Sequence, residues 1–431
     1  MATAICTAGS RSIESSLRPL APDGINVKSK SAHKWQFPTR IRPNAFSWKS
    51  SRVAVQRVKE AVAEIAGVAR HDAITAAEGA VRLIERLSPA LEQVDSSSGA
   101  LGSAVNAAIE ALVPLIAAAP VPNKVREKWL ERLYAAHEAD GIPYIEILTD
   151  YWGELCVTKE LASTWADQLQ EITRLALSPD KSLRGHYHGT TACLDALLRA
   201  ERFAELYDIL KSEKFWSYKR WAVKALAAQG KPDEAIQLAE SSRGPWTSDT
   251  DVNQLCEGIL LSLGRIEEAY RRYGLYTHRA GTYLATFRAV AKAYPGIPRA
   301  QILSDLIENS PGDEGKWFAT AKELGMYEVA LRLVRESPCD PKTLTRAARD
   351  FAEREPAFAH GAGLAALHWL TQGHGYEITS IDVWGAYHST LKAAEQLGTL
   401  SDTKTRIRQL VAQEAAGGFV RQVLGRELAL A

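Results

Sequence analysis

The segment whose residue types best suit chemistry lies near the middle of the chain, at residues 184–193, RGHYHGTTAC. His186 and His188 form a His-x-His pattern close to a thiol, and imidazole and thiolate are both zinc ligands. No second Cys/His pair lies near them in the sequence, so an anion site fits better here than a metal site. Arg184, the imidazoles and free amides at a helix start would suit a phosphate or carboxylate. The interpretation we favour over both is a helix-entry loop in which Thr190 or Thr191 is the cap.

Two later segments interleave cations with aromatic rings. The first is KFWSYKR, residues 214–220, and the second is KWF, residues 316–318, which opens a helix after Asp313. Such residues can line a groove for an acidic peptide or a nucleic acid through charge and cation–π contacts. They can also be helix residues whose rings belong to the core, which is the interpretation we favour. The groove-binding candidates in these segments are Trp216, Tyr218, Lys219, Arg220, Lys316 and Trp317.

A basic and aromatic arm precedes the first predicted helix, with the sequence HKWQFPTRIRPNAFSWKSS at residues 33–51. Its prolines forbid a continuous helix. Such a stretch can hold nucleic acid by phosphate contact and base stacking. Alternatively, its aromatic rings anchor on the first helices while its charges face an acidic body, and we favour this anchoring. The nucleic-acid candidates within the arm 28–59 are Lys34, Trp35, Arg40, Arg42, Trp48 and Lys49.

The charge distribution agrees with a basic arm on an acidic body. Residues 1–59 hold eleven Lys and Arg against two acidic residues, while the whole chain has a net charge of +1. The remainder of the chain is therefore acidic, and a partner of opposite charge to the arm lies within the same molecule.

Motifs of known catalytic classes are missing from the sequence. It contains no G-x-S-x-G, no Walker loop, no H-E-x-x-H and no G-x-G-x-x-G. Acidic pairs such as Glu267 and Glu268 fall at expected turns that face solvent. The sequence makes no positive case for an enzyme, and we expect no cofactor; an enzyme or ligand sensor with its site near 184–193 stays open as an alternative.

The elements that must position these residues are helices. Apolar residues recur at three- and four-residue steps, and no convincing period-two strand occurs in the sequence. Asp72 and Thr158 stand where N-caps are expected. Residues 100–118 are so apolar that we expect burial on most sides, and Val125 is expected to point inward. The helices predicted in the first part of the chain cover residues 52–68, 72–93, 100–118, 124–138, 143–156 and 158–177.

A repeated helix–turn–helix unit organises the chain after residue 185. Gly230 and Gly264, 34 residues apart, each open a segment that ends in a small Ala, and Gly325 opens a third copy. The glycine permits a tight turn, and the Ala lets two helices approach closely. A degenerate copy has Glu201 at the glycine position and Leu206 at the Ala position.

This unit resembles the tetratricopeptide repeat, whose period is about 34 residues. The resemblance covers residues 190–336, but the step from Gly264 to Gly325 is 61 residues, and the usual aromatic and closing proline are mostly missing. The whole chain is also similar to a group of uncharacterised bacterial helical-repeat proteins, a similarity that carries no function. The resemblance implies an all-α fold, a right-handed α-solenoid of antiparallel helix pairs with a concave groove.

Length and composition set the remaining bounds. The chain has 431 residues, 46% hydrophobic and 24% charged, which is typical of soluble proteins. Its five cysteines show no C-x-x-C pair, so we expect buried free thiols. The start, MATAICTAGSRS, has no basic region followed by an apolar core, which favours a cytoplasmic location and no membrane contact. The alanine-rich composition suggests a bacterial source.

These observations define one organisation and one leading function. We expect an arm at residues 1–50, disordered over 1–32, an N-terminal helical domain at 51–178 and a repeat domain at 179–431. The leading hypothesis is a non-enzymatic scaffold that binds a protein or peptide in its concave groove. The alternatives are a nucleic-acid-associated protein that uses the arm and the enzyme or sensor described above.

Overall fold

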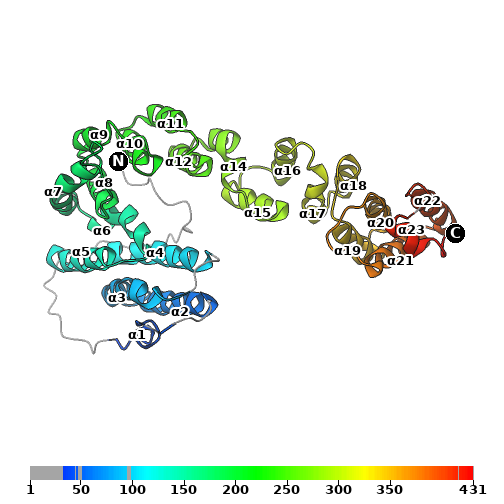
Figure 1. Cartoon of the computed structure of the whole chain (residues 1–431), viewed down its shortest axis with the longest axis horizontal. Helices are drawn as coiled ribbons and strands as arrows, with labels where there is room; N and C mark the ends of the chain where they lie inside the picture. Colours follow the sequence, from blue (N-terminus) through cyan, green and yellow to red (C-terminus); the bar gives the residue numbers. More distant parts are fainter. Residues whose placement is uncertain (1–32, 44, 47–50, 95–98, 416, 431) are drawn as a thin grey trace. The chain divides into compact units, whose positions relative to one another are not determined.

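The computed structural model describes residues 33–43, 45–46, 51–94, 99–415 and 417–430. Every regular element within these ranges is a helix, so the all-α prediction is confirmed (Figure 1). The chain forms two compact units, Met1–Leu255 and Cys256–Ala431. The disorder predicted for residues 1–32 lies outside the described residues.

The first unit consists of helices that follow one another along the chain. Asp72 and Thr158 are N-caps as predicted, because their side chains accept the N–H groups of Thr75 at 2.9 Å and Leu161 at 3.2 Å. The helix predicted at 143–156 is wrong as one element, since a 3₁₀ turn precedes a short helix there. The elements are α1 Phe37–Arg40, α2 Ser51–Ala69, α3 Ala73–Leu91, α4 Ala100–Ala118, α5 Asn123–Glu138, η1 Glu146–Tyr151, α6 Trp152–Cys156, α7 Lys159–Ala176, α8 Thr190–Arg199, α9 Phe203–Leu210, α10 Trp216–Ala228 and α11 Pro232–Ser241.

One apolar core joins these helices, and its members run from Phe37 to Ala225. Trp152 and Trp221 are the largest of its fully buried side chains. Helices α7 and α8 pack against each other, so the core continues across the boundary predicted near residue 178. Burial of this apolar surface is what holds the short helices in place.

Helix α4 differs from its prediction of burial on most sides. By length and composition it is the one helix in the described ranges that could cross a membrane, and 39% of its apolar window is buried. Its buried side packs against α2 and α3. Ala107, Glu110 and Pro114 are exposed. A helix this rich in alanine can leave one face open, because a methyl group exposes little apolar area.

Helix α5 corrects a second prediction. Val125 is 37% exposed, whereas Arg126 is 4% exposed. The Arg126 guanidinium donates to the carbonyl oxygens of Ile116 at 3.0 Å and Ala119 at 2.8 Å. The last carbonyls of a helix have no partner within it, so this arginine caps the end of α4. The hydrophobic pattern placed the valine inward because it carries no information about such a cap.

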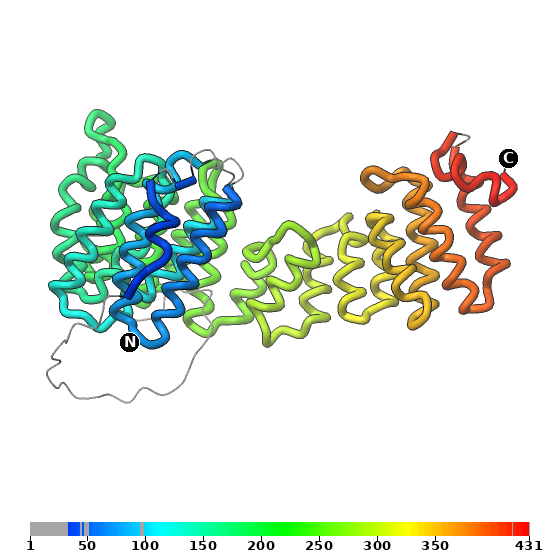
Figure 2. The backbone as a smooth tube through the Cα atoms, turned by 90° about the horizontal axis from the view of Figure 1, so that it is seen from below, coloured from blue at the N-terminus to red at the C-terminus, as the bar shows by residue number. Residues whose placement is uncertain are grey.

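Helix α12, Asp249–Ser262, spans the division between the units, and further helices follow it to the end of the described chain (Figure 2). The elements of the second unit are α13 Ile266–Ala269, η2 Tyr270–Gly274, α14 Leu275–Thr277, α15 Tyr283–Ala293, α16 Arg299–Glu308, η3 Glu314–Trp317, α17 Phe318–Glu323, α18 Tyr327–Glu336, α19 Pro341–Phe351, α20 Pro356–Thr371, α21 Ser380–Gln396, α22 Leu400–Ala412 and α23 Phe419–Leu424. Many of these helices contact a neighbour in the chain, and several contact the next but one, as α19 contacts both α20 and α21.

The turns between paired helices share one backbone geometry. At Gly230, Gly264 and Gly325 the φ angle is +76°, +71° and +71°, and at Glu201 it is +59°. In each turn the following N–H bonds to the carbonyl five residues earlier, as Lys231 does to Leu226 at 3.0 Å. This is the Schellman ending, in which a left-handed residue lets the chain reverse. The same bond and a positive φ recur at Gly373 and Gly398.

Candidate functional site

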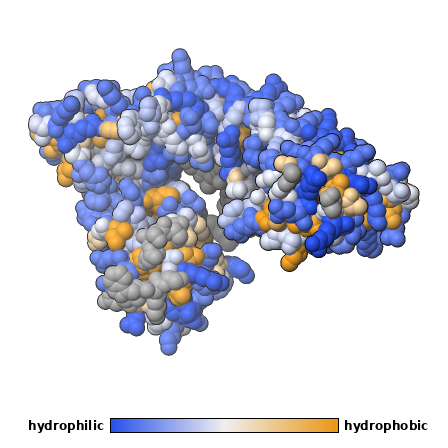
Figure 3. Space-filling model, turned by 45° about the vertical axis from the view of Figure 1, so that its right-hand side comes forward, coloured by the Kyte–Doolittle hydropathy of each residue, from blue (hydrophilic) through white to orange (hydrophobic). Residues whose placement is uncertain are grey.

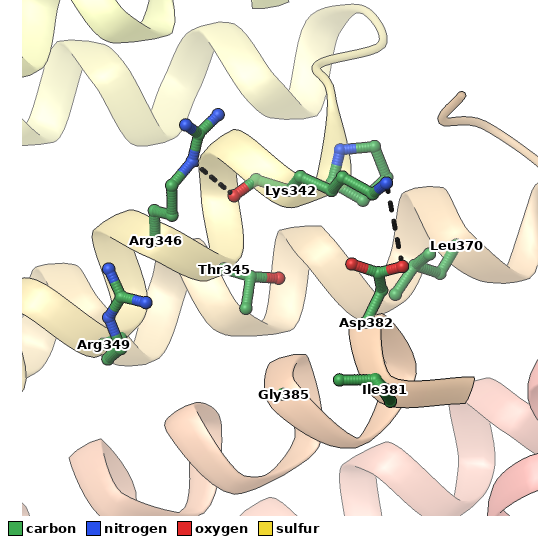
Figure 4. A pocket seen from close by; sticks show the side chains of 9 residues that line it. Lys342, Thr345, Arg346, Arg349, Leu370, Ile381, Asp382 and Gly385 are labelled. Carbon is green, nitrogen blue, oxygen red and sulfur yellow. Dashed lines mark hydrogen bonds and ion pairs between the residues drawn. The ribbon is translucent and has the colours of Figure 1, made fainter. Parts of the chain in front are cut away.

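A groove of about 360 Å³ lies between α19 and α21 in the second unit (Figure 4). Helix α20 connects these two helices and packs against both. The groove is lined by Pro341, Lys342, Thr345, Arg346, Arg349, Leu370, Ile381, Asp382 and Gly385. It has the size of a site for a small ligand or a few peptide side chains.

One wall of the groove is a row of cations on α19. Lys342, Arg346 and Arg349 are spaced by four and three residues, so they share one face of the helix. The opposite face is buried through Leu344, Ala347, Ala348 and Phe351. The Asp340 side chain caps the helix by accepting the Thr343 N–H at 2.9 Å. The buried face fixes the rotation of α19 and thereby turns the cations toward the groove.

The positive charge of this wall is only partly compensated. The Arg346 side chain donates to the carbonyl of Lys342 and the hydroxyl of Thr343, both at 3.1 Å, and both partners are neutral. Arg349 pairs with the adjacent Asp350 at 2.8 Å, and both side chains are more than half exposed, at 65% and 53%. Such a pair contributes little, so the arginines remain able to bind an anion.

The facing wall comes from the first turn of α21. Ile381 is 81% exposed. Asp382 accepts the Thr379 N–H at 2.8 Å and lies 3.7 Å from the Lys342 ammonium group. Burial raises the pKa of Asp382, but the bonds from Thr379 and the nearby lysine outweigh it and hold the pKa below its usual value. A Cβ at Gly385 would lie 3.7 Å from Thr345 Cγ2, which is an ordinary van der Waals contact. A side chain at position 385 would therefore occupy part of the groove, and glycine leaves this space empty.

The lining suits binding better than catalysis. Its described residues include no histidine, cysteine, serine or glutamate, and its carboxylate at Asp382 is engaged as a helix cap. Most of the molecular face in the space-filling view is hydrophilic, with apolar residues in separate patches (Figure 3). What distinguishes the groove is a cationic wall beside the apolar side chains of Leu370 and Ile381.

The predicted anion loop at 184–193 is largely occupied by its own contacts. Arg184 pairs with the buried carboxylate of Glu213 at 2.6 Å and lies over the Phe215 ring at 5.6 Å. His186 and His188 are exposed, with ring centroids 4.7 Å apart. The carboxylate competes with any incoming anion, and the anion site stays a prediction. Within the described residues no group of three or more His, Cys, Asp and Glu side chains is placed to hold a metal.

The threonine cap proposed for this loop is wrong. Helix α8 begins at Thr190 with Gly189 as N-cap and no side-chain cap bond. A Cβ at Gly189 would lie 2.6 Å from the hydroxyls of Tyr134 and Tyr187, which bond to each other at 2.9 Å. A glycine is needed there because the two tyrosines leave no space. This contact comes from a residue 55 positions earlier, which a local pattern cannot reveal.

His137 is a member of this region that the sequence did not indicate. It is 2% exposed, and its Nε2–H donates to the His188 carbonyl at 3.1 Å. Its Nδ1 has no partner within the described structure. Burial lowers the pKa of His137, so the neutral ring is favoured and the residue fixes the loop rather than carrying charge.

The cation–aromatic segments place their predicted tryptophans in the core. Trp216 is 6% exposed and Trp317 is 3% exposed. Arg220 pairs with Asp150 at 2.7 Å, and Lys316 pairs with Asp313 at 2.8 Å. Tyr218 and Lys219 are half-buried. The burial of both tryptophans agrees with the interpretation that the rings of these segments belong to the core. A groove role for the remaining candidates, Tyr218, Lys219, Arg220 and Lys316, stays a prediction.

The described part of the arm, residues 33–43 and 45–46, lies on α2 and α3. Phe37 and Phe46 are buried, and Trp35 packs against Gly79. The Glu64 carboxylate accepts the N–H groups of Gln36 at 2.7 Å and Phe37 at 3.2 Å.

The charges of the arm show the same anchoring. Arg40 pairs with Glu60 at 3.2 Å, while Lys34 and Arg42 are exposed. Trp48 and Lys49 lie outside the described residues. The contacts are those of the anchored-arm interpretation, and nucleic-acid binding by the arm stays a prediction.

The free thiols predicted from the cysteine spacing are confirmed for the four that the structure describes. Cys156, Cys193, Cys256 and Cys339 are buried and belong to no disulfide, and Cys6 lies outside the described residues. Burial raises the pKa of Cys193 to about 11 and that of Cys339 to about 12. Thiols of this kind are poor nucleophiles at neutral pH.

No protein-family model and no curated protein matches the chain. The functional argument therefore depends on the site alone.

Proposed function

We propose that this protein is a non-enzymatic scaffold that binds a protein or peptide segment on the concave face of a helical-repeat array. The array is of the tetratricopeptide type, a right-handed solenoid of antiparallel helix pairs. The recurring left-handed turns and the packing of helices on their next-but-one neighbours support this architecture. We place its action in the cytoplasm, without a cofactor.

The observation that carries the proposal is the groove between α19 and α21. In a two-layer array, helices two apart in the chain lie side by side in the same layer, and we place α19 and α21 in the inner layer. Helices α19 and α21 have this relation. Their groove offers exposed cations and an exposed Ile381, which are features of protein-binding surfaces rather than of a reaction centre.

Photo-crosslinking tests whether the groove engages a polypeptide. A photoreactive phenylalanine derivative replaces Ile381, and in a control variant it replaces Lys404, which is exposed on α22. In the native cells we expect an adduct at position 381 that protease removes and nuclease does not, and no equivalent adduct at position 404. Equal adducts at both positions, no adduct, or a nuclease-sensitive adduct would count against the proposal.

A further inference from the structure

We propose that the groove between α19 and α21 selects an acidic peptide segment that places an apolar side chain between its carboxylates. This inference rests on the proposed function and specifies the chemistry of its ligand. It follows from three features of the groove: the spacing of its cations, its apolar lining and the residue types that its described lining does not contain.

The cations provide the first argument. Lys342 and Arg346 lie one helical turn apart, which is about 6 Å along the axis at about 1.5 Å per residue. An extended peptide advances about 6.6 Å over two residues. Carboxylates at alternate peptide positions therefore match successive cations of α19. Arg346 has neutral hydrogen-bond partners within its own helix, so a carboxylate would meet an uncompensated guanidinium.

The apolar residues provide the second argument. Leu370 is 5% exposed at the base of the groove, and Ile381 is 81% exposed on its opposite wall. Pro341 adds a third apolar surface beside Lys342. A medium-sized aliphatic side chain of the ligand would be buried against Leu370 and would cover Ile381, and burial of apolar surface favours binding.

The lining also distinguishes a peptide from a nucleic acid. No aromatic ring stands among the described lining residues, so bases have no stacking surface. Asp382 lies in the wall, 3.7 Å from Lys342. Its carboxylate can accept a backbone N–H of an extended peptide, a donor that a phosphodiester backbone does not have. The groove therefore favours carboxylates on a flexible chain.

A peptide selection tests the proposal with the full-length protein. The protein is immobilised and presented with a random dodecapeptide display library at low salt. We expect the selected sequences to be enriched in Asp or Glu at alternate positions around Leu, Ile or Val. Synthetic versions of the selected peptides are then measured by fluorescence anisotropy. Matched versions carry Gln in place of Glu, phosphoserine in place of Glu, or Ser in place of the apolar residue.

The variants separate the groove from the rest of the surface. Reversal of two charges in Arg346→Glu/Arg349→Glu should weaken binding of the acidic peptide at least tenfold, on the order of the loss expected for two unfavourable charge contacts. Arg346→Lys/Arg349→Lys should retain most of the affinity. Lys404→Glu/Arg406→Glu on α22, which also reverses two exposed cations, should leave binding within about twofold. Circular dichroism checks that each variant is folded.

Each outcome of the selection has a defined meaning. Selected peptides that are neutral or basic, or acidic peptides that bind the Arg346→Glu/Arg349→Glu variant equally well, would overturn the ligand class while leaving peptide binding intact. Selection of no peptide at all would contradict the proposed function itself. Stronger binding of the phosphoserine version would show that the groove selects phosphate rather than carboxylate, and would overturn this part of the proposal. Competition by a single-stranded oligonucleotide stronger than that by the acidic peptide would favour a nucleic acid and overturn the proposal.

Discussion

Asp195 lies on α8 with its carboxylate turned into the first unit. It accepts the Gly153 N–H at 2.7 Å, and the residue is 9% exposed. Burial raises the pKa of Asp195 to about 7, against the opposing influence of Lys224 and the Gly153 hydrogen bond. Asp150 raises the pKa further and Arg220 lowers it. A buried carboxyl of this kind binds its proton more tightly in the folded protein than in the unfolded chain.

This difference predicts a pH-dependent stability. Between about pH 3.8 and pH 7 the folded protein holds a proton that the unfolded chain releases, so the free energy of unfolding falls as pH rises through this window. Asp195→Asn keeps an acceptor for Gly153 and has no charge to bury. We expect the variant to be more stable than the wild type at pH 8 and to lose this advantage near pH 4. The advantage at pH 8 can reach about 4 kcal/mol, because the pKa rises from 3.8 to about 7 and each pKa unit corresponds to about 1.4 kcal/mol.

Chemical denaturation followed by circular dichroism at a series of pH values measures the effect. Glu127→Gln on the exposed side of α5 is the matched control, and its difference from the wild type should change little with pH. An advantage of Asp195→Asn that is equal at pH 4 and pH 8 would show that the carboxyl titrates alike in both states and would contradict the argument.

Residues such as Asp195 and Arg126 could not be predicted from the sequence. Their partners, the Gly153 amide and the carbonyls at the end of α4, are backbone groups that the fold supplies. Backbone groups are present at every position, so no residue type marks the ones that will be unsatisfied. The N-caps at Asp72 and Thr158 were predictable because donor and acceptor lie three residues apart.

At the scale of elements, the turn before α9 has a glutamate, Glu201, at a position whose left-handed backbone conformation favours glycine. Glu201 adopts φ +59°, where a side chain costs about 1–2 kcal/mol relative to glycine. We expect Glu201→Gly to raise the free energy of unfolding of the first unit by about 1 kcal/mol. Gly230→Ala, in the equivalent turn before α11, should lower it by a similar amount, because that glycine has φ +76°.

The ion pair of Glu201 requires its own control. The carboxylate lies 2.5 Å from the Lys159 ammonium group, and the two side chains are 48% and 57% exposed, so the pair contributes little. Glu201→Ala removes the pair but keeps the Cβ. Urea denaturation should therefore find Glu201→Ala close to the wild type and below Glu201→Gly. A glycine variant no more stable than the alanine variant would show that the turn carries no strain.

Several turns between paired helices were predicted from the sequence, whereas the groove between α19 and α21 was not. The turns at Gly230, Gly264, Gly325 and even Glu201 were recognisable because the helix reversal requires a left-handed residue. Gly373 and Gly398 were not recognised as further copies, since neither is followed by an Ala five residues later.

The groove between α19 and α21 was not predicted from the sequence, because no aromatic ring stands among its described lining residues to mark it as a cation–aromatic cluster. Rings of that size pack into the core wherever they can, as Trp216 and Trp317 do. The useful signal was the row of cations on α19 (Pro341–Phe351), which lie at helical spacing opposite its apolar face. Even this signal does not identify the helix that forms the other wall of the groove, because α21 begins 29 residues after α19 ends.

At the scale of the whole molecule, every member of the apolar core, from Phe37 to Ala225, belongs to the first unit. In an array whose helices contact only near neighbours, stability is a sum of local terms. A fragment that keeps every member of this core should therefore fold without the second unit. This property is also what made the fold class predictable, since each helix pair is specified by its own short stretch of sequence.

Two fragments test this locality. Residues 1–248 retain α1 to α11 and all of the core, whereas residues 1–210 lack α10 and with it Trp221, which is fully buried. We expect the longer fragment to unfold cooperatively in urea and to keep the pH-dependent advantage of Asp195→Asn. The shorter fragment should be destabilised by at least about 3–5 kcal/mol, the cost of losing one large core side chain. A longer fragment without a cooperative transition, or two fragments of equal stability, would mean that the first unit depends on contacts beyond its own core.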